Sequence, residues 1–175
     1  MQSIRIARCL MLCILASLTT LSVQAEDKGK KDAVPAGWQL VKPKIGGVTF
    51  LLPKDGVTKI GNEYVESYTA LNDGEVFIVT IAEEDGLKKP GNTKKVLEEH
   101  VEKAVKNLKG KLTSKKEVSL GDHPGLEYKV TFDDGEVAGY RVYAIKNHLI
   151  ELHSGPANKE KSTTTYYKSL KLVKK

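Results

Sequence analysis

The sequence predicts a single α+β domain in which an antiparallel β-sheet is flanked by helices. Alternating apolar segments meet at Asp134-Gly135, and a second pair meets across Asn72-Asp73-Gly74. Asp-Gly between such segments is a strong hairpin signal, because tight hairpin turns need positive φ. Between the two pairs, residues 93–108 repeat apolar side chains at helical spacing.

Residues 1–25 are predicted to be an export signal that is removed by cleavage. Arg5 and Arg8 form its charged start, residues 9–21 its apolar segment, and residues 23–25 a small-residue cleavage site. The alternative is a membrane anchor, but polar residues interrupt the apolar run, which is shorter than the ~20 residues that a spanning helix needs. Lipidation at Cys13 is disfavoured, because Leu12 stands where a small residue is required.

Cleavage changes the composition of the mature chain. It removes Cys9 and Cys13, the chain's 2 cysteines, which excludes disulfides, thiol catalysis and cysteine-ligated zinc. It leaves 26 basic residues against 22 acidic ones, a formal charge of +4. Arg141 is then the one arginine among dispersed lysines, whereas nucleic-acid binding usually needs clustered arginines. No nucleic-acid partner is expected.

Residues 26–37 are predicted to be a flexible linker, and residues 38–175 the domain. The Glu75–Ala82 strand is apolar on both faces, which predicts a central strand that is covered on both sides. The other expected elements are a strand at 47–52, a loop at 54–62, a strand at 64–71, a helix from Asn92 or Thr93 to Leu108, a strand at 117–120 and a helix at about 158–170.

The last three strands are predicted to form a meander of Leu126–Phe132, Val137–Ile145 and Leu149–Ser154. A two-residue turn at Asp134-Gly135 pairs Tyr128 with Arg141 and Leu126 with Tyr143. A two-residue turn at Lys146-Asn147 pairs Ile150 with Tyr143, whereas a three-residue turn there would exchange the two faces of the last strand.

Four segments of the chain together form a recognisable pattern: Gly121-Asp122-His123-Pro124-Gly125-Leu126-Glu127-Tyr128, Gly139-Tyr140-Arg141-Val142-Tyr143, Asn147-His148-Leu149-Ile150 and Tyr166-Tyr167-Lys168-Ser169-Leu170-Lys171-Leu172. This pattern resembles the small exported bacterial proteins of the PsbP/Mog1-like fold. The resemblance covers about residues 38–172 and implies an antiparallel sheet flanked by helices. Members include a photosystem accessory subunit and a small-GTPase-binding protein. The resemblance implies an accessory or binding role, but no functional motif of these members is matched by residues of this chain.

Arg141 is the main candidate binding residue, because it is expected on an apolar face between Tyr128 and Tyr143. One hypothesis is an anion anchor, in which the guanidinium stacks on tyrosine and binds a carboxylate or phosphate. The alternative is that its stem packs while its head reaches solvent or pairs with an acid of a covering helix.

Metal binding and catalysis have little support in the sequence. Glu151 and His153 share a sheet face and are the weak metal candidates, while the three other histidines have no predicted convergence. No nucleophile, phosphate-binding loop or calcium loop is recognised. We therefore expect no catalytic residue and no cofactor.

These observations predict an exported, non-catalytic accessory or binding module of the cell envelope. Its expected location is the periplasm or the medium, and its expected state is a monomer without a transmembrane segment after cleavage. The partner is an envelope protein or a small ligand. The alternatives are a periplasmic protein that binds a small molecule or a metal, and a hydrolase with an unrecognised site.

Overall fold

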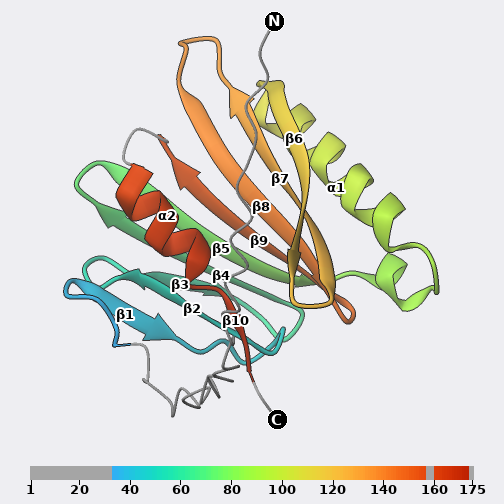
Figure 1. The fold of residues 1–175 in the computed structure, drawn as a ribbon, viewed down its shortest axis with the longest axis horizontal. Coiled ribbons are helices and arrows are strands. Elements are labelled where there is room, and N and C mark those ends of the chain that lie inside the picture. Colours follow the sequence, from blue (N-terminus) through green and yellow to red (C-terminus); the bar gives the residue numbers. More distant parts are fainter. Residues whose placement is uncertain (1–32, 157–159, 174–175) are drawn as a thin grey trace, which may run out of the picture. The chain divides into compact units, whose positions relative to one another are not determined.

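The computed structural model describes residues 33–156 and 160–173, which form two antiparallel sheets and two α-helices (Figure 1). The larger sheet has the order β3-β4-β5-β9-β8-β7-β6, and the smaller one has the order β1-β2-β10. The predicted signal peptide and most of the predicted linker lie outside the described residues. The elements are β1 (Trp38–Val41), β2 (Val48–Pro53), β3 (Thr58–Gly61), β4 (Val65–Asn72), β5 (Glu75–Glu83), the 3₁₀ turn η1 (Asp85–Lys88), α1 (Thr93–Leu108), β6 (Lys111–Leu120), β7 (His123–Thr131), β8 (Val137–Ile145), β9 (His148–Gly155), α2 (Glu160–Lys168) and β10 (Lys171–Leu172).

The first predicted hairpin is confirmed as β4 and β5. Asn72 pairs with Glu75, and both turn residues have positive φ, 49° at Asp73 and 80° at Gly74. β5 lies inside the large sheet between β4 and β9. One of its faces is fully buried, but Ile78 on the other face is only half-buried. The prediction that β5 is covered on both sides therefore holds for one face only.

The predicted register between β8 and β9 is also confirmed. Ile145 pairs with His148 across the two-residue turn, which places Tyr143 opposite Ile150. Lys146 adopts a φ of 55°, as the first position of such a turn requires.

The predicted register between β7 and β8 is wrong by one residue. Thr131 pairs with Val137, so Tyr128 lies opposite Tyr140 and not opposite Arg141. The Gly135 amide donates to the Phe132 carbonyl, and the Phe132 amide donates to the Glu136 carbonyl. With φ of 85° at Gly135, this is a three-residue loop that ends in a left-handed glycine, rather than a two-residue turn. The extra residue moves Arg141 to the other face of the sheet from Tyr128.

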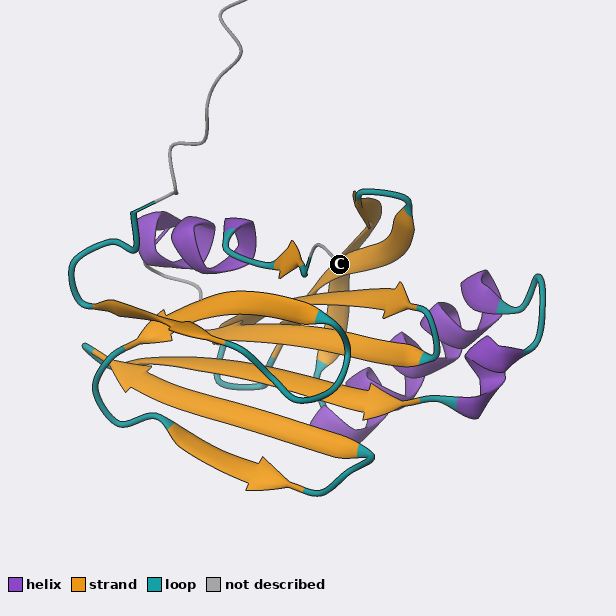
Figure 2. Ribbon diagram, turned by 90° about the horizontal axis from the view of Figure 1, so that it is seen from below, coloured by secondary structure: helices purple, strands orange, loops and turns teal. Residues whose placement is uncertain are grey.

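The two helices lie on opposite sides of the large sheet (Figure 2). α1 has the predicted bounds and packs on β7 and β8 through Val96, Leu97 and Val101. It ends at Leu108 and is capped by Lys109, which takes a left-handed φ of 53° just before the predicted stop at Gly110. α2 packs on the other face, where Tyr166 is fully buried against Phe77.

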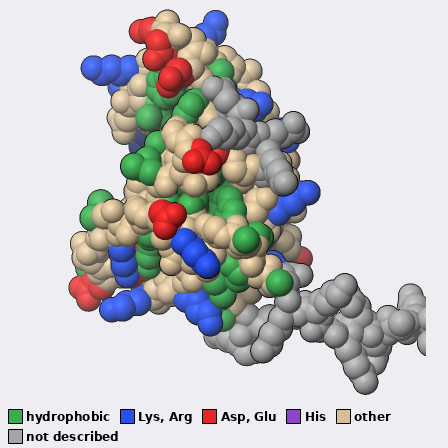
Figure 3. Space-filling view, turned by 90° about the vertical axis from the view of Figure 1, so that its left-hand side faces the viewer, with side chains coloured by type: hydrophobic (Ala, Val, Ile, Leu, Met, Phe, Trp, Pro, Cys, Tyr) green, Lys and Arg blue, Asp and Glu red, His purple; other side chains and the backbone are tan. Residues whose placement is uncertain are grey.

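The hydrophobic core is therefore divided into two clusters by the large sheet. One cluster joins β2 and α2 to the large sheet, and the other joins α1 to β7, β8 and β9. Some hydrophobic side chains also reach the surface. In Figure 3 they lie in the middle of the face shown, with charged side chains mostly around them.

Three strands were missed or shortened in the sequence-based prediction. β3 lies in the predicted loop at 54–62, β10 was not predicted, and β6 begins at Lys111 instead of Glu117. β3 and β6 are the two edges of the large sheet, and nearly all of their residues are at least partly exposed. Their sequences lack apolar alternation because neither strand has a fully buried face.

Candidate functional site

Arg141 lies in an ion-pair cluster on the α2 side of the sheet. Its Nε donates to Glu127 Oε2 at 2.5 Å, and the guanidinium lies 4.5 Å from the ring centre of Tyr167. Lys116 Nζ binds the other Glu127 oxygen at 2.7 Å. Burial alone would raise the pKa of Glu127, but Lys116 and Arg141 hold it below its usual value.

The predicted trio of Arg141, Tyr128 and Tyr143 is not assembled. Tyr143 shares the face of Arg141, whereas Tyr128 lies beneath α1 on the opposite face. The guanidinium pairs with an acid, as the alternative hypothesis expects, but the acid comes from the neighbouring strand β7 rather than from a covering helix.

Glu151 and His153 share a sheet face, as predicted, but their side chains are engaged by other residues. Glu151 Oε2 lies 2.5 Å from His100 Nε2 on α1, and its Oε1 accepts a hydrogen bond of 2.8 Å from the Tyr128 hydroxyl. His153 stacks on Tyr140, with the ring centres 4.5 Å apart. Within the described residues, no three His, Cys, Asp or Glu side chains converge as a metal site would require.

The environment of this group shifts two of its pKa values. Burial opposes ionisation of Glu151, but the hydrogen bonds from His100 and Tyr128 outweigh it and hold the pKa of Glu151 below its usual value. Burial lowers the pKa of His153, and the charge of Glu151 offsets only part of that effect. The charge of Glu151 is therefore satisfied inside the protein and is not presented to a ligand.

The same face of the sheet continues beyond His153 onto β5, β4 and β3. His153 lies opposite Ile78, Ile78 opposite Thr69, and Thr69 opposite Thr58. Side chains alternate along each strand, so every second residue of β3, β4 and β5 lies on this face. We call these positions the open strand face: Thr58, Ile60, Val65, Ser67, Thr69, Leu71, Val76, Ile78, Thr80 and Ala82.

No residue of the open strand face is charged, although the chain has 28 basic and 22 acidic residues among 175. Large aliphatic side chains on it are exposed, with 67% of Ile60 and 60% of Leu71 accessible to solvent. α1 packs mainly on β7 and β8 and does not cover it. On the reverse side of the same strands, Tyr68 and Phe77 are buried in the core. The open strand face is thus an uncharged, partly exposed surface of aliphatic and hydroxyl side chains.

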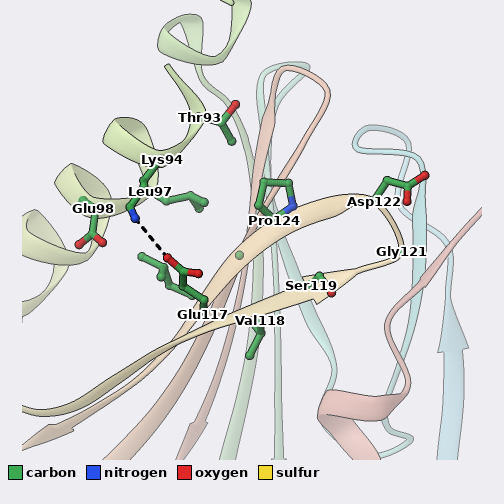
Figure 4. A pocket seen from close by; sticks show the side chains of 12 residues that line it. Thr93, Lys94, Leu97, Glu98, Glu117, Val118, Ser119, Gly121, Asp122 and Pro124 are labelled. Carbon is green, nitrogen blue, oxygen red and sulfur yellow. Dashed lines mark hydrogen bonds and ion pairs between the residues drawn. The ribbon is translucent and has the colours of Figure 1, made fainter. Parts of the chain in front are cut away.

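A second candidate is an open cleft between α1 and the β6–β7 hairpin (Figure 4). Its volume is about 730 Å³, and its apolar lining includes Leu97, Pro124 and Leu126. Charged residues stand around it. Lys94 Nζ on α1 lies 3.2 Å from Glu117 Oε1 on β6.

In the wall of the cleft, the backbones of β7 and β8 approach each other closely at Gly125. A Cβ atom at Gly125 would lie 2.4 Å from the Val142 carbonyl oxygen, so only glycine fits there. Another lining carboxylate, that of Glu98, forms an ion pair with Lys115. Two of the cleft's acids are thus already paired with lysines of the chain, which leaves the apolar wall as its main binding feature.

Sequence analysis missed both candidates for identifiable reasons. The open strand face includes β3, which has no apolar alternation to reveal it. Its positions on β5 were visible, but they were interpreted as a second covered face of that strand. The cleft needs the docking position of α1, which no local pattern contains. The Gly121–Gly125 corner that forms its far wall was recognised only as a structural motif.

The fold has a clear counterpart among solved structures. The solution structure of cyanobacterial PsbP (CyanoP) from Synechocystis sp. PCC 6803 matches 81% of this chain and 95% of that chain, with a TM-score of 0.56 and 16% sequence identity. The fold is PsbP-like. A protein of unknown function from Pseudomonas aeruginosa matches 73% of this chain and 89% of that chain, with a TM-score of 0.38 and 11% identity.

The predicted PsbP-like α+β fold is therefore confirmed, although the sequence similarity is low. No protein-family model matches the sequence, and no curated protein matches it. Neither helix within residues 33–156 and 160–173 is long and apolar enough to cross a membrane.

Proposed function

We propose that this protein is an exported, non-catalytic accessory module that binds a partner protein of the cell envelope. The observation that carries the proposal is the open strand face. Ten outward positions on three adjacent strands lack charge, and several of their aliphatic side chains are exposed. Contiguous exposed apolar surfaces of this kind mark sites of protein association.

The position of the titratable groups also favours binding over catalysis. Glu151, Tyr128 and His153 have shifted pKa values, but they are engaged with one another or with neighbouring side chains under and beside α1. A catalytic site would place such groups in a cavity that substrate can enter. The PsbP-like fold is consistent with an accessory role. Export rests on the sequence of residues 1–25, which has the charged, apolar and cleavage regions of a signal.

The proposal can be tested by crosslinking in intact cells that produce the tagged full chain. Wild type should capture one envelope protein saturably, and the captured protein should be identified by mass spectrometry. Leu71→Glu should reduce this capture at least ~10-fold, because it buries a charge in an apolar interface. Leu40→Glu is the matched control, since Leu40 is 47% exposed on β1, away from the open strand face.

The outcomes separate the possible functions. Equal capture by wild type and both variants would overturn the proposed interface. Recovery of an unprocessed chain that still contains residues 1–25 would overturn export. A small-ligand function is the second candidate, because the volume of the α1–β6–β7 cleft falls in the range of ligand sites. It predicts that a ligand raises the melting temperature of wild type but not of Pro124→Glu, because Pro124 lines the cleft and is exposed.

A further inference from the structure

We infer that the open strand face binds an amphipathic α-helix of the partner, lying beside α1 with an uncharged aliphatic stripe against β3, β4 and β5. This inference rests on the proposed function and specifies the partner. An antiparallel sheet can leave one face to solvent, but that face then carries polar and charged residues, whereas an uncharged, apolar face normally packs against a second layer. Here α2 and β2 cover one face, but α1 covers only the β7–β8 part of the other. The partner helix would complete that layer.

The dimensions of the open strand face fit one helix. From β3 to β9 there are three strand spacings, or about 14 Å. Along β4, Val65 to Leu71 spans seven residues, which is six residue steps or about 20 Å. A helix with side chains is about 10 Å wide and covers 20 Å with about 13 residues. Centred between β4 and β5, its axis would lie about three strand spacings, or about 14 Å, from α1 over β7 and β8, so the two helices would lie side by side without close packing.

The charges around the site define the stripe that the helix must present. The open strand face itself offers no charge, so a charged side chain of the helix would be buried there without a partner. At the boundary with α1, His100 and Glu151 pair with each other and leave no free carboxylate. Ala104 and Asn107 follow His100 at helical spacing and are uncharged, whereas Lys103, three residues after His100, is an exposed cation beside them. Complementarity therefore requires aliphatic or hydroxyl side chains at i, i+4, i+7 and i+11 of the helix.

A single helix of this length buries less surface than the ~800 Å² per partner of a standard interface. We therefore expect a dissociation constant in the micromolar range. A second copy of this chain is a less suitable occupant. Two sheets pack about 10 Å apart, and α1 stands above the sheet beside the site, where it would obstruct the approach of the second sheet.

The test uses two fluorescent 14-residue peptides held helical by a side-chain staple. The stripe peptide carries Leu, Val and Thr at i, i+4, i+7 and i+11 and charged residues elsewhere. The scrambled peptide has the same composition without the stripe. Binding to the tagged full chain is measured by fluorescence anisotropy, and amide protection of residues 65–71 and 76–82 by hydrogen exchange. Leu71→Glu and Ile60→Glu alter the site, and Leu40→Glu is the control.

The stripe peptide should bind wild type and Leu40→Glu alike, protect both strands, and bind Leu71→Glu and Ile60→Glu at least ~10-fold more weakly. Equal affinity for the two peptides, or equal affinity of all variants, would overturn the inference. A homodimer that Leu71→Glu dissociates would assign the site to a second copy. If neither peptide binds but cellular capture still depends on Leu71, the helix is wrong and the proposed function stands. If the stripe peptide binds but capture is insensitive to Leu71→Glu, the site stands and the proposed function fails.

Discussion

The sheet face that carries α1 has two halves with different side chains: one half lies beneath α1, and the other half, formed by β3, β4 and β5, is open. The half beneath α1 carries Tyr128, Tyr140 and Glu151, and its polar groups are buried and mostly hydrogen-bonded. The open half carries only aliphatic and hydroxyl side chains, and several are exposed. Burying a polar group without a hydrogen-bond partner costs free energy, whereas an exposed apolar side chain forgoes the stabilisation that burial would supply. The open half therefore has the side-chain composition of a surface that binds another protein.

Exposure alone does not explain the absence of charge on the open half. β6 is also exposed along most of its length, and there Lys115, Lys116 and Glu117 form ion pairs with neighbouring elements. Charged residues on edge strands also discourage pairing with other chains. The sequence therefore places charge on one exposed strand and omits it from the outward positions of β4 and β5, which agrees with a binding role for the open strand face.

The largest expected difference concerns two leucines on the two halves. Leu97→Ala on α1 should lower the free energy of unfolding by ~2–5 kcal/mol, because Leu97 is 3% exposed and its removal leaves a cavity. Leu71→Ala should change it by no more than ~0.5 kcal/mol, because that side chain already contacts solvent. Urea unfolding followed by far-ultraviolet circular dichroism measures both. Similar losses in the two variants would show that the open strand face is covered in solution.

A smaller effect is expected from the buried carboxylate. Glu151→Gln should lower the free energy of unfolding by ~1–3 kcal/mol, because it removes the negative charge to which His100 and Tyr128 are hydrogen-bonded. Glu98→Gln is the matched control on the other flank of α1. Its partner Lys115 is exposed, so the loss should stay below ~1 kcal/mol. Thermal and urea unfolding measure both losses. If Glu98→Gln loses more stability than Glu151→Gln, the carboxylate of Glu151 contributes less to stability than its burial indicates.

The sequence allowed much of the fold to be predicted, because local patterns determine much of it. The Asp73-Gly74 turn, the α1 stripe and the β8–β9 turn follow from residue preferences within a few positions, and all are confirmed. The Asp134-Gly135 turn failed because Asp-Gly also suits a three-residue loop with a left-handed glycine, and only the paired strands select between the two. The one extra residue in this loop places Arg141 and Tyr128 on opposite faces of the sheet, so the predicted site is not formed. The open strand face and the cleft arise from where α1 docks, which is a tertiary property.

The smallest expected effect is a pH dependence at the boundary of the two halves. Burial lowers the pKa of His153 in the folded protein below its ordinary value of 6.5. Between these two pKa values the unfolded chain binds a proton that the folded protein does not, so stability should fall as the pH drops below about 6.5. His153→Phe keeps the stacking on Tyr140 but cannot titrate. It should lose less stability than wild type between pH 7 and pH 5.5, measured as the change in urea midpoint.

His148 should preserve part of the dependence in this variant, because burial lowers its pKa too. Below about pH 4.5 both proteins should lose further stability, since the folded-state pKa values of Glu151 and Glu127 are held low. Tyr140→Phe is the control, because Tyr140 has its pKa raised to about 12 and does not titrate in this range. An unchanged pH dependence in His153→Phe would mean that solvent reaches His153 freely. The boundary between the covered and open halves would then lie closer to α1 than His153.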